Sequence, residues 1–308
     1  MFTETDPEQV KLKNLIEALI LGHTVQWSNV TLPQKTVLTT LNALSLTYHS
    51  TQTILNLVDK PSVTLLDHNA CLNHVNLKRL RHLIVTNSTL QQMDDLPHFS
   101  LCVAEFQSHG HGRRQQPWVS TFAENLLCTI KLPVPQDSNN ITLKTAIAIT
   151  QVLRSMLPIH SIGIKYPNDI YANKQKLGGI LAHIKNDDLL ISFGINVNMI
   201  DGSIDQPWTS LSLLTGQYYD RSQLLNRILT TLLEELNTES VDFNRLNSYD
   251  VCVNQPVYLA HQPDCIGIGL GFVSHGTYQV QFETSLHELG PNEQLRLYYD
   301  PEALSKIT

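Results

Sequence analysis

Strand-length apolar runs alternate with helical segments over the middle of the chain, and this alternation limits the fold more than any other feature. The runs cover residues 83–85, 101–106, 126–132 and 188–199. One helical segment covers 142–157 and ends before Pro158, and another covers 222–236 with Asp220 as its N-cap and Gln223 at capping-box spacing. Strands mixed with helices in this way predict a sheet covered by helices.

The N-terminal part of the chain is predicted to form a helical domain. Apolar residues recur at helical spacing from Val10, and two further short helical patterns lie around 37–44 and 51–58. A turn and a short extended pair follow over 59–69. Three small helices and a hairpin predict a winged-helix-like domain over residues 1–75.

The last part of the chain changes pattern again. Four short apolar runs are separated by turn residues, and they cover 255–261, 266–274, 277–283 and 294–300. This pattern predicts a small antiparallel β-domain over 251–308. The segment 76–250 is then the central domain, and the chain as a whole is α+β.

Composition narrows the class of protein. Hydrophobic residues make up 42% of the 308 residues and charged residues only 16%, which is typical of a globular chain. The sequence has no apolar run of about 18 residues, and its N-terminus is acidic, so we expect no membrane span and no signal peptide. Five scattered cysteines without a CxxC pair predict reduced thiols in a cytoplasmic protein. The net charge of −7 argues against nucleic acid as the main partner.

The segment "QSHGHGRRQQPWVS", residues 107–120, is a polar loop between two apolar strands. Gly110 and Gly112 let a backbone approach a ligand closely and allow positive φ, while Arg113 and Arg114 place forked cations beside it. We interpret it as an anion-binding loop, with an exposed polar turn as the alternative. A zinc site on the two histidines is disfavoured, because no third ligand is near.

The segment "IKYPNDIYANKQKLGGILAHI", residues 164–184, predicts a hairpin. Pro167 should end the first strand, and two adjacent glycines, Gly178 and Gly179, leave the returning strand open to close approach. The hairpin should gather Lys165, Asp169 and Lys176 at one end. A solvated tip is the alternative. A third glycine, Gly194 in the run "SFGINVNM", would let a flat ligand lie against its strand.

In this order, "VTNSTLQQM", "AEFQSHGHGRRQQPWVS", "IKYPNDIY…KLGGIL" and "FGINVNM" resemble the motifs of the biotin protein ligases. The resemblance covers about Leu83 to Asp300. It implies a central mixed sheet with helices, the class II synthetase-like fold of these ligases, and an SH3-like C-terminal barrel. The helical N-terminal domain matches the ligase class that is also a transcriptional repressor.

The resemblance also implies the chemistry. Such ligases join biotin to ATP as biotinyl-5′-AMP, with Mg²⁺ accompanying the nucleotide, and then transfer biotin to a lysine of the biotin carboxyl carrier domain of acetyl-CoA carboxylase. A homodimer and an operator DNA are the further partners that it suggests. We expect no protein cage for the metal, which would accompany ATP near Asp169.

By motif position, the resemblance implies roles for individual residues. Lys176, Arg113 and Asp169 would be catalytic, with Lys176 holding carboxylate or phosphate oxygens and Asp169 orienting lysines or carrying Mg²⁺. Ser88 and Thr89 would contact the biotin rings and Gln107 the polar edge of the ligand. The remaining expected biotin or adenylate contacts are Leu90, Gly110, His111, Gly112, Arg114, Trp118, Lys165, Asn168, Gly179 and Asn196.

This chain departs from the motif at several positions. His111 stands where the family has an arginine, Leu90 where an amide is common and Asn87 where an aspartate is common. Between Asn14 and Asp59, where a DNA-reading helix should lie, Lys35 is the only lysine or arginine. A biotin-responsive DNA-binding regulator with weak ligase activity is therefore the alternative function. A lipoate or octanoate transferase is disfavoured, because the loop and hairpin motifs occur together in the biotin pattern.

Overall fold

A computed structural model describes residues 3–4, 6–59, 61–135, 138, 140–157, 162–274, 276–290 and 292–298. The chain separates into two compact units. The first comprises Met1–Val134, Leu181–Ile204 and Ser210–Asn226, and the second comprises Pro135–Ile180, Asp205–Thr209 and Arg227–Thr308. Each unit is described by itself, and the division into domains 1–75, 76–250 and 251–308 stays a prediction.

The first unit begins with two α-helices and a small sheet. Asp6 caps the first helix by accepting from the backbone N–H of Glu8 at 2.9 Å, and Pro7 occupies its first position, where no N–H is needed. The small sheet has the strand order β2-β4-β3. The elements are α1 (Pro7–Ile20), β2 (Val25–Gln26), η1 (Trp27–Asn29), α2 (Gln34–Ala43), β3 (Tyr48–Ser50) and β4 (Ile54–Leu57).

The helix predicted around 51–58 is wrong, because this segment is the second half of the hairpin β3–β4. The hydroxyl of Thr51 accepts from the backbone N–H groups of Thr53 and Ile54 at 3.3 and 3.2 Å. This local bond favours a turn over a helix. Leu55 and Leu57 are then buried on one face of β4, with the period of two that a strand requires.

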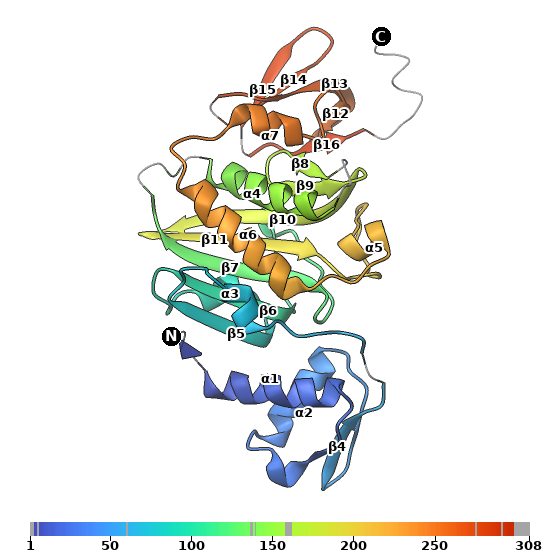
Figure 1. Cartoon of the computed structure of the whole chain (residues 1–308). Coiled ribbons are helices and arrows are strands. Elements are labelled where there is room, and N and C mark those ends of the chain that lie inside the picture. Colours follow the sequence, from blue (N-terminus) through green and yellow to red (C-terminus); the bar gives the residue numbers. More distant parts are fainter. Residues whose placement is uncertain are drawn as a thin grey trace. The chain divides into compact units, whose positions relative to one another are not determined.

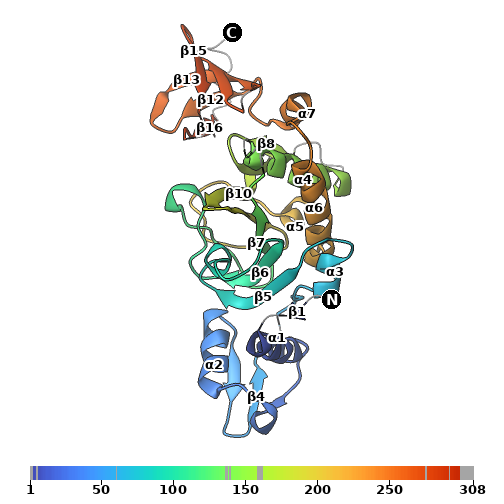
Figure 2. The same ribbon diagram turned by 90° about the vertical axis from the view of Figure 1, so that its left-hand side faces the viewer.

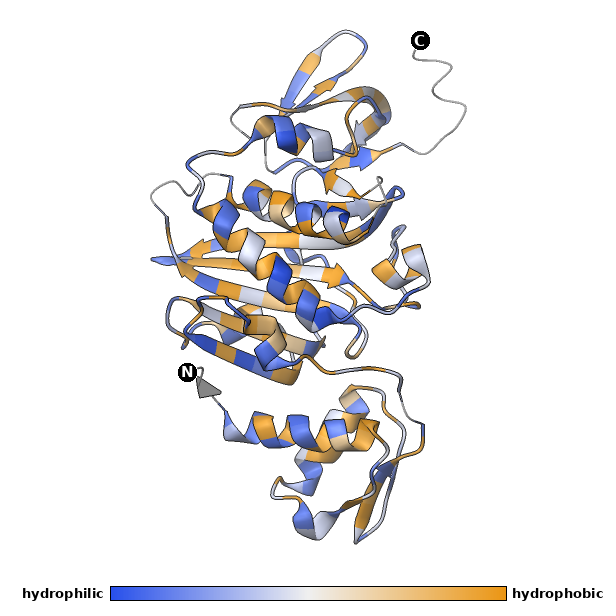
Figure 3. Ribbon diagram, viewed as in Figure 1, coloured by the Kyte–Doolittle hydropathy of each residue, from blue (hydrophilic) through white to orange (hydrophobic). Residues whose placement is uncertain are grey.

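The N-terminal helices share a hydrophobic core with the large sheet of the same unit. Figure 3 shows that α1 carries both hydrophilic and hydrophobic residues along its length. Its buried residues are Leu12, Ile16 and Leu19. The same cluster contains Ile84 and Phe122. Burial of this apolar surface therefore holds the helices to the sheet.

The large sheet of the first unit follows the order β1-β5-β6-β7-β11 (Figures 1 and 2). Pairs β1–β5 and β5–β6 are parallel, and β6–β7 and β7–β11 are antiparallel, so the sheet is mixed. The four apolar runs of the sequence are confirmed as strands. The bounds are β1 (Thr3–Glu4), β5 (Arg79–Thr86), β6 (Ser100–Gln107), β7 (Asn125–Pro133) and β11 (Asp188–Asn196).

Short helices complete the first unit. They are α3 (His68–Leu72), η2 (Leu90–Gln92), η3 (Arg113–Gln115) and α5 (Leu211–Thr215). The helix α6 (Arg221–Leu236) begins in this unit and ends in the second. The cap predicted for α6 is confirmed, because Asp220 Oδ1 accepts from the N–H groups of Ser222 and Gln223 at 2.8 and 3.2 Å.

The second unit contains the predicted helix and hairpin. The helix is α4 (Ile141–Met156), and Pro158, its expected stop, lies outside the described residues. The hairpin is confirmed. It consists of β9 (Asp169–Ala172) paired antiparallel with β10 (Gln175–Lys185), and β8 (Gly163–Lys165) pairs with the other edge of β9. Strand β10 continues into the first unit from Leu181.

The second unit ends with α7 (Phe243–Tyr249) and an antiparallel sheet, which confirms the predicted antiparallel strands. Its order is β15-β14-β13-β12-β16, so within the described residues the sheet has two edges and is not a closed barrel. The strands are β12 (Pro256–Leu259), β13 (Gln262–Phe272), β14 (Tyr278–Gln281), β15 (Leu286–Leu289) and β16 (Leu295–Leu297). Among the helices described in both units, none has the length and apolarity needed to cross a membrane.

Candidate functional site

Thr89 and Gln107 form the centre of a neutral polar cluster in the first unit. The backbone N–H of Thr89 donates to Gln107 Oε1 at 2.6 Å. The side-chain amide nitrogen of Gln107 therefore points toward the loop that begins at Gly110. A Cβ atom at Gly110 would lie 2.8 Å from that nitrogen. The group that lies close to Gly110 in this structure is thus the side chain of Gln107, and the predicted approach of a ligand stays a prediction.

The loop after Gly110 folds back on itself like a small hairpin. The N–H of Gly112 donates to the carbonyl of Gln116, and that of Trp118 donates to the carbonyl of Gly110, both at 2.8 Å. The left-handed residues of the loop are Arg114 (φ 54°) and Gln115 (φ 59°). Gly110 and Gly112 would permit positive φ angles, but neither adopts one, since the tight turn lies at Arg114 and Gln115.

His111 and the two arginines lie along this folded loop. The backbone of His111 is paired with that of Pro117, and the ring Nδ1 lies 3.3 Å from the carbonyl oxygen of Gly112. His111 and Arg113 are half-buried, whereas Arg114 is exposed. The loop thus keeps two cations next to its turn, which is compatible with an anion ligand.

The indole of Trp118 lies on the backbone of β11 at Gly194. A Cβ atom at Gly194 would lie 2.6 Å from Cε2 of the indole ring. The flat group that lies against the strand at this glycine is Trp118, and the predicted contact with a flat ligand stays a prediction. Trp118 and Gly194 together form an apolar platform beside the neutral cluster.

Ser88 and Leu90 flank Thr89 in different environments. Ser88 is buried, with 5% of its surface exposed. Leu90 opens the helix η2 and packs against the apolar cluster that contains Met93 and Cys102. Leu90 is therefore part of the packing behind the turn, which explains why an apolar side chain can stand at this position.

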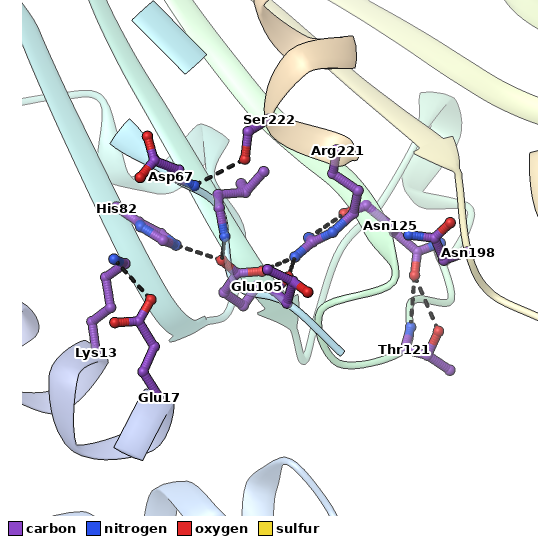
Figure 4. Close-up of polar contacts among 12 residues, drawn as sticks. Lys13, Glu17, Asp67, His82, Glu105, Thr121, Asn125, Asn198, Arg221 and Ser222 are labelled. Atoms are coloured by element: carbon purple, nitrogen blue, oxygen red, sulfur yellow. Dashed lines mark hydrogen bonds and ion pairs between the residues drawn. The ribbon is translucent and has the colours of Figure 1, made fainter. Parts of the chain in front are cut away.

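Asn196 belongs to a buried network that the sequence did not reveal. Figure 4 shows four other members of it, His82, Glu105, Asn125 and Arg221. Its Oδ1 accepts from Asn125 Nδ2 at 3.0 Å. Arg221 donates to the carbonyl of Asn125 at 3.0 Å and to Glu105 Oε2 at 2.8 Å. The other carboxylate oxygen of Glu105 lies 2.7 Å from His82 Nε2. The sequence feature that could have indicated this network is Glu105, a glutamate inside the apolar run 101–106.

Glu105 is a buried carboxylate that stays charged. Burial by itself would raise its pKa, but Arg221 and the bond from His82 lower the pKa to about 2. The same carboxylate accepts from the backbone N–H of Leu66 at 2.7 Å. Arg221 also donates to the carbonyl of Thr64. The network therefore fixes the segment that follows the N-terminal helices on to β6.

A charged cluster in the second unit consists of Lys165, Asp169 and Lys176, which the hairpin brings together as predicted. Lys176 Nζ lies 2.9 Å from Asp169 Oδ1, and Lys165 Nζ lies 3.6 Å from Asp169 Oδ2. Burial would raise the pKa of Asp169, but Lys176 and then Lys165 lower it below its ordinary value. Burial lowers the pKa of Lys165, and Asp169 opposes that shift.

The backbone of Lys176 bonds through both its N–H and its carbonyl to the segment around Trp208. Its N–H donates to the carbonyl of Pro207 at 3.0 Å, and its carbonyl accepts from Thr209 at 2.9 Å. These bonds fix the root of the side chain, so that Asp169 can hold its ammonium group in a defined place. The arrangement leaves two cations and one carboxylate, which suits an anionic ligand.

Asn168 and Gly179 are structural parts of the hairpin. The side chain of Asn168 donates to the carbonyl of Ile180 at 2.8 Å, and the N–H of Ile180 donates back to the carbonyl of Asn168 at 2.9 Å. Gly179 lies opposite Asp169 in the register of β9 and β10. Both residues therefore fix the position of Asp169.

The charged cluster does not suit direct metal binding by Asp169. Each of its carboxylate oxygens faces a lysine, which favours the lysine-orienting role over Mg²⁺ ligation. Within the ranges that the structure describes, no three His, Cys, Asp or Glu residues are grouped as a metal site requires.

Residues 83–198, which contain the neutral cluster and the hairpin, match the model of the Biotin/lipoate A/B protein ligase family. The resemblance to biotin protein ligases is thereby confirmed.

Two bacterial relatives are similar to this chain over part of their length. "Bifunctional ligase/repressor BirA" of Escherichia coli is 30% identical over 204 residues, which are 61% of this chain and 63% of that protein. "Biotin--[acetyl-CoA-carboxylase] ligase" of Mycobacterium tuberculosis is 28% identical over 151 residues, which are 47% of this chain and 55% of that protein. The chain thus spans less than two thirds of the length of both.

A solved structure supports the fold. The biotin protein ligase of Aquifex aeolicus, in complex with biotin and ATP, superposes with a TM-score of 0.65 at 24% identity. The match covers 72% of this chain and all of that one. The mixed α/β architecture is therefore the one found in biotin protein ligases.

Proposed function

We propose that this protein is an ATP-dependent biotin protein ligase. The observation that carries the proposal is the occurrence, within the residues that match one family model, of a neutral polar cluster with an apolar platform and of two lysines held on a carboxylate. The first suits an uncharged ring system with an apolar chain, and the second suits an anion. Biotin and ATP together present both kinds of group.

The reaction has two steps. A carboxylate oxygen of biotin attacks the α-phosphorus of ATP, and the bond from that phosphorus to the bridging oxygen breaks, so that pyrophosphate leaves with the electron pair. The lysine amine of a carrier domain then attacks the acyl carbon of biotinyl-5′-AMP. The acyl–oxygen bond breaks, AMP leaves, and the amine loses a proton.

The neutral cluster would bind the ureido ring of biotin. Such a ring has one carbonyl acceptor and two N–H donors, and Ser88, Thr89 and Gln107 offer hydroxyl and amide groups of both kinds. Trp118 and Gly194 would contact the apolar part of the ligand. The loop from Gly110 to Trp118 would then cover the adenylate and keep water from the anhydride.

The charged cluster would reduce the repulsion between the two anions of the first step. Lys176 is the residue that we expect to contact the reacting oxygens, with Lys165 adding positive charge. Asp169 would hold Lys176 in place, as its 2.9 Å contact suggests. Mg²⁺ enters as a companion of ATP, bound mainly through the phosphates.

The second substrate would be a biotin carboxyl carrier domain, the partner that the name of the Mycobacterium tuberculosis relative suggests. A cytoplasmic location agrees with this partner. The small β-domain at the C-terminus would correspond to the SH3-like domain of such ligases, opened between β15 and β16.

A second candidate function is biotin-dependent repression. Two helices and a β-hairpin precede the family domain, an arrangement compatible with a winged-helix module, and the Escherichia coli relative is named as a ligase and repressor. Operator binding by a homodimer would then accompany ligation. Lys35 at the start of α2 is the cation available for a phosphate contact.

One assay separates the two functions. The purified protein is mixed with biotin, labelled ATP, Mg²⁺ and a carrier domain, and both pyrophosphate release and carrier biotinylation are measured. A ligase biotinylates the carrier only when ATP is present. Tight operator binding without any carrier labelling would identify a regulator instead.

A further inference from the structure

A chain of three hydroxyl groups runs behind Thr89 in the first unit. Thr129 Oγ1 lies 2.9 Å from Thr89 Oγ1 and 2.8 Å from Ser192 Oγ. Thr129 is fully buried, and Thr89 is 3% exposed. Neither Thr129 nor Ser192 was recognised from the sequence, although each is a hydroxyl residue inside an apolar strand.

The sheet fixes the geometry of this chain. Thr129 and Ser192 lie directly opposite each other in the register of β7 and β11, so their side chains are on one face. Cys102 of β6 lies opposite Thr129 on its other side and belongs to an apolar cluster that includes Leu190. Hydrogen bonds in such surroundings are stronger than in water, and an unpaired hydroxyl there is costly.

The hydroxyl chain has two arrangements in which Thr129 donates its hydrogen to one of its neighbours. Each hydroxyl carries one hydrogen, so Thr129 can donate to only one of its two neighbours. If Ser192 donates to Thr129 and Thr129 donates to Thr89, the hydrogen of Thr89 is available to a ligand acceptor. In the reverse direction, Thr89 donates inward and presents only its lone pairs. The chain therefore decides what Thr89 offers.

We propose that Thr129 and Ser192 are positioning residues for the ureido ring of biotin, acting through the hydroxyl of Thr89. This inference rests on the proposed function. The N–H of Thr89 is already held by Gln107 Oε1, so the hydroxyl is the remaining group of Thr89 that the protein must orient. A ureido ring presents both an acceptor and donors. Depending on the direction of the hydroxyl chain, Thr89 can donate to the ring carbonyl or accept from a ring N–H.

The test compares Thr129→Val, which keeps the shape and removes the hydroxyl, with Thr129→Ser, which keeps the hydroxyl. Biotin affinity is measured calorimetrically without ATP. In the carrier assay we measure kcat, the KM for biotin and the KM for ATP. For Thr129→Val we expect the biotin Kd and KM to rise about tenfold, with kcat changed less than about twofold and the KM for ATP unchanged. Thr129→Ser should recover most of the affinity.

Two further variants control the result. Ser192→Ala removes the far end of the chain and should raise the biotin Kd about threefold. It also provides a readout should Thr129→Val not fold. Thr145→Val is the matched control, because Thr145 is equally buried and bonds to the carbonyl of Ile141 in α4. It should leave the biotin Kd unchanged.

The outcomes separate this inference from the proposed function. If the unsubstituted protein binds no biotin, the proposed function fails and the inference fails with it. If that protein binds biotin and folded Thr129→Val binds it equally well, the inference alone is overturned. Equal losses in Thr129→Ser and Thr129→Val would also overturn it, because the hydroxyl would then not be the group that matters.

Discussion

The polar cluster of the first unit and that of the second unit differ in charge. Thr89, Gln107 and the hydroxyl chain are neutral, whereas Lys165, Asp169 and Lys176 are ionised side chains. Neutral groups select a ligand by the direction of hydrogen bonds, whereas fixed cations stabilise charge as it develops. Substitutions in the first cluster should therefore change mainly the KM for biotin, and those in the second mainly kcat.

Lys176→Ala should have the largest effect. It removes the cation closest to Asp169 Oδ1, and we expect the rate of biotin-dependent pyrophosphate release to fall by about 100- to 1,000-fold. Lys174→Ala, in the exposed turn of the same hairpin, is the control and should turn over normally. Normal turnover of Lys176→Ala, with the fold intact by circular dichroism, would refute the assignment.

Two buried carboxylates, Glu105 and Asp250, differ in the same way in their surroundings, because only Glu105 has a charged partner among the described residues. Arg221 and His82 hold the pKa of Glu105 at about 2 against the effect of burial, so its contribution to stability is present above pH ~4.5 and lost as pH falls toward 2. In the part of the chain that the structure describes, Asp250 forms no ion pair. It accepts hydrogen bonds from Tyr278 at 2.6 Å, from the N–H of Cys252 at 2.8 Å and from the backbone of Val253, and burial raises its pKa to about 6.

Asp250→Asn tests this difference. Because the folded protein holds a proton on Asp250 that the unfolded chain has lost, stability should fall as pH rises from about 4 to 6. The asparagine variant should not show this fall. Its free energy of unfolding relative to the parent should therefore rise by about 2–3 kcal/mol between pH 4 and 7. Urea titrations at a series of pH values measure it, and a pH-independent difference would contradict the shift.

Gly194→Ala probes the neutral side. The added Cβ would lie 2.6 Å from the indole of Trp118 and must displace it. We expect the KM for biotin to rise about tenfold, which is about 1.4 kcal/mol of binding, with a much smaller change in kcat. Gly290→Ala meets nothing within 4 Å and serves as the control. A change confined to kcat would show that the platform does not contact biotin.

His111→Arg should have the smallest effect. It restores a permanent cation at the loop, and the adenylate should dissociate about threefold more slowly if that side chain faces the phosphate. The off-rate of labelled biotinyl-5′-AMP measures this. An unchanged off-rate would show that the side chain at this position points elsewhere.

The parts that the sequence revealed are those set by local pattern. The strands β7 and β11 are continuous apolar runs, and the hairpin needs only its own turn to bring Lys176 to Asp169. Thr129 and Ser192 could not be found in this way. Thr129 is 40 residues from Thr89 and 63 residues from Ser192 along the chain. Only the register of the sheet makes these residues neighbours.

The sequence analysis missed structural details that depend on individual hydrogen bonds and not on a repeating pattern. The segment 51–58 has apolar residues that fit a helix or a strand, and the hydroxyl of Thr51 decides for a turn. In the loop, the left-handed angles fall on Arg114 and Gln115 and not on the glycines that would permit them, because the backbone pairs of the loop place its turn there.

The core shared by α1, α2 and β5 bears on how the protein unfolds. Leu12, Ile16 and Leu41 are buried in the same cluster as Ile84 and Phe122, so releasing the helices would expose part of the sheet to water. The N-terminal helices and the sheet should therefore melt in one cooperative transition. A ligand that stabilises the sheet should also slow amide hydrogen exchange in α1.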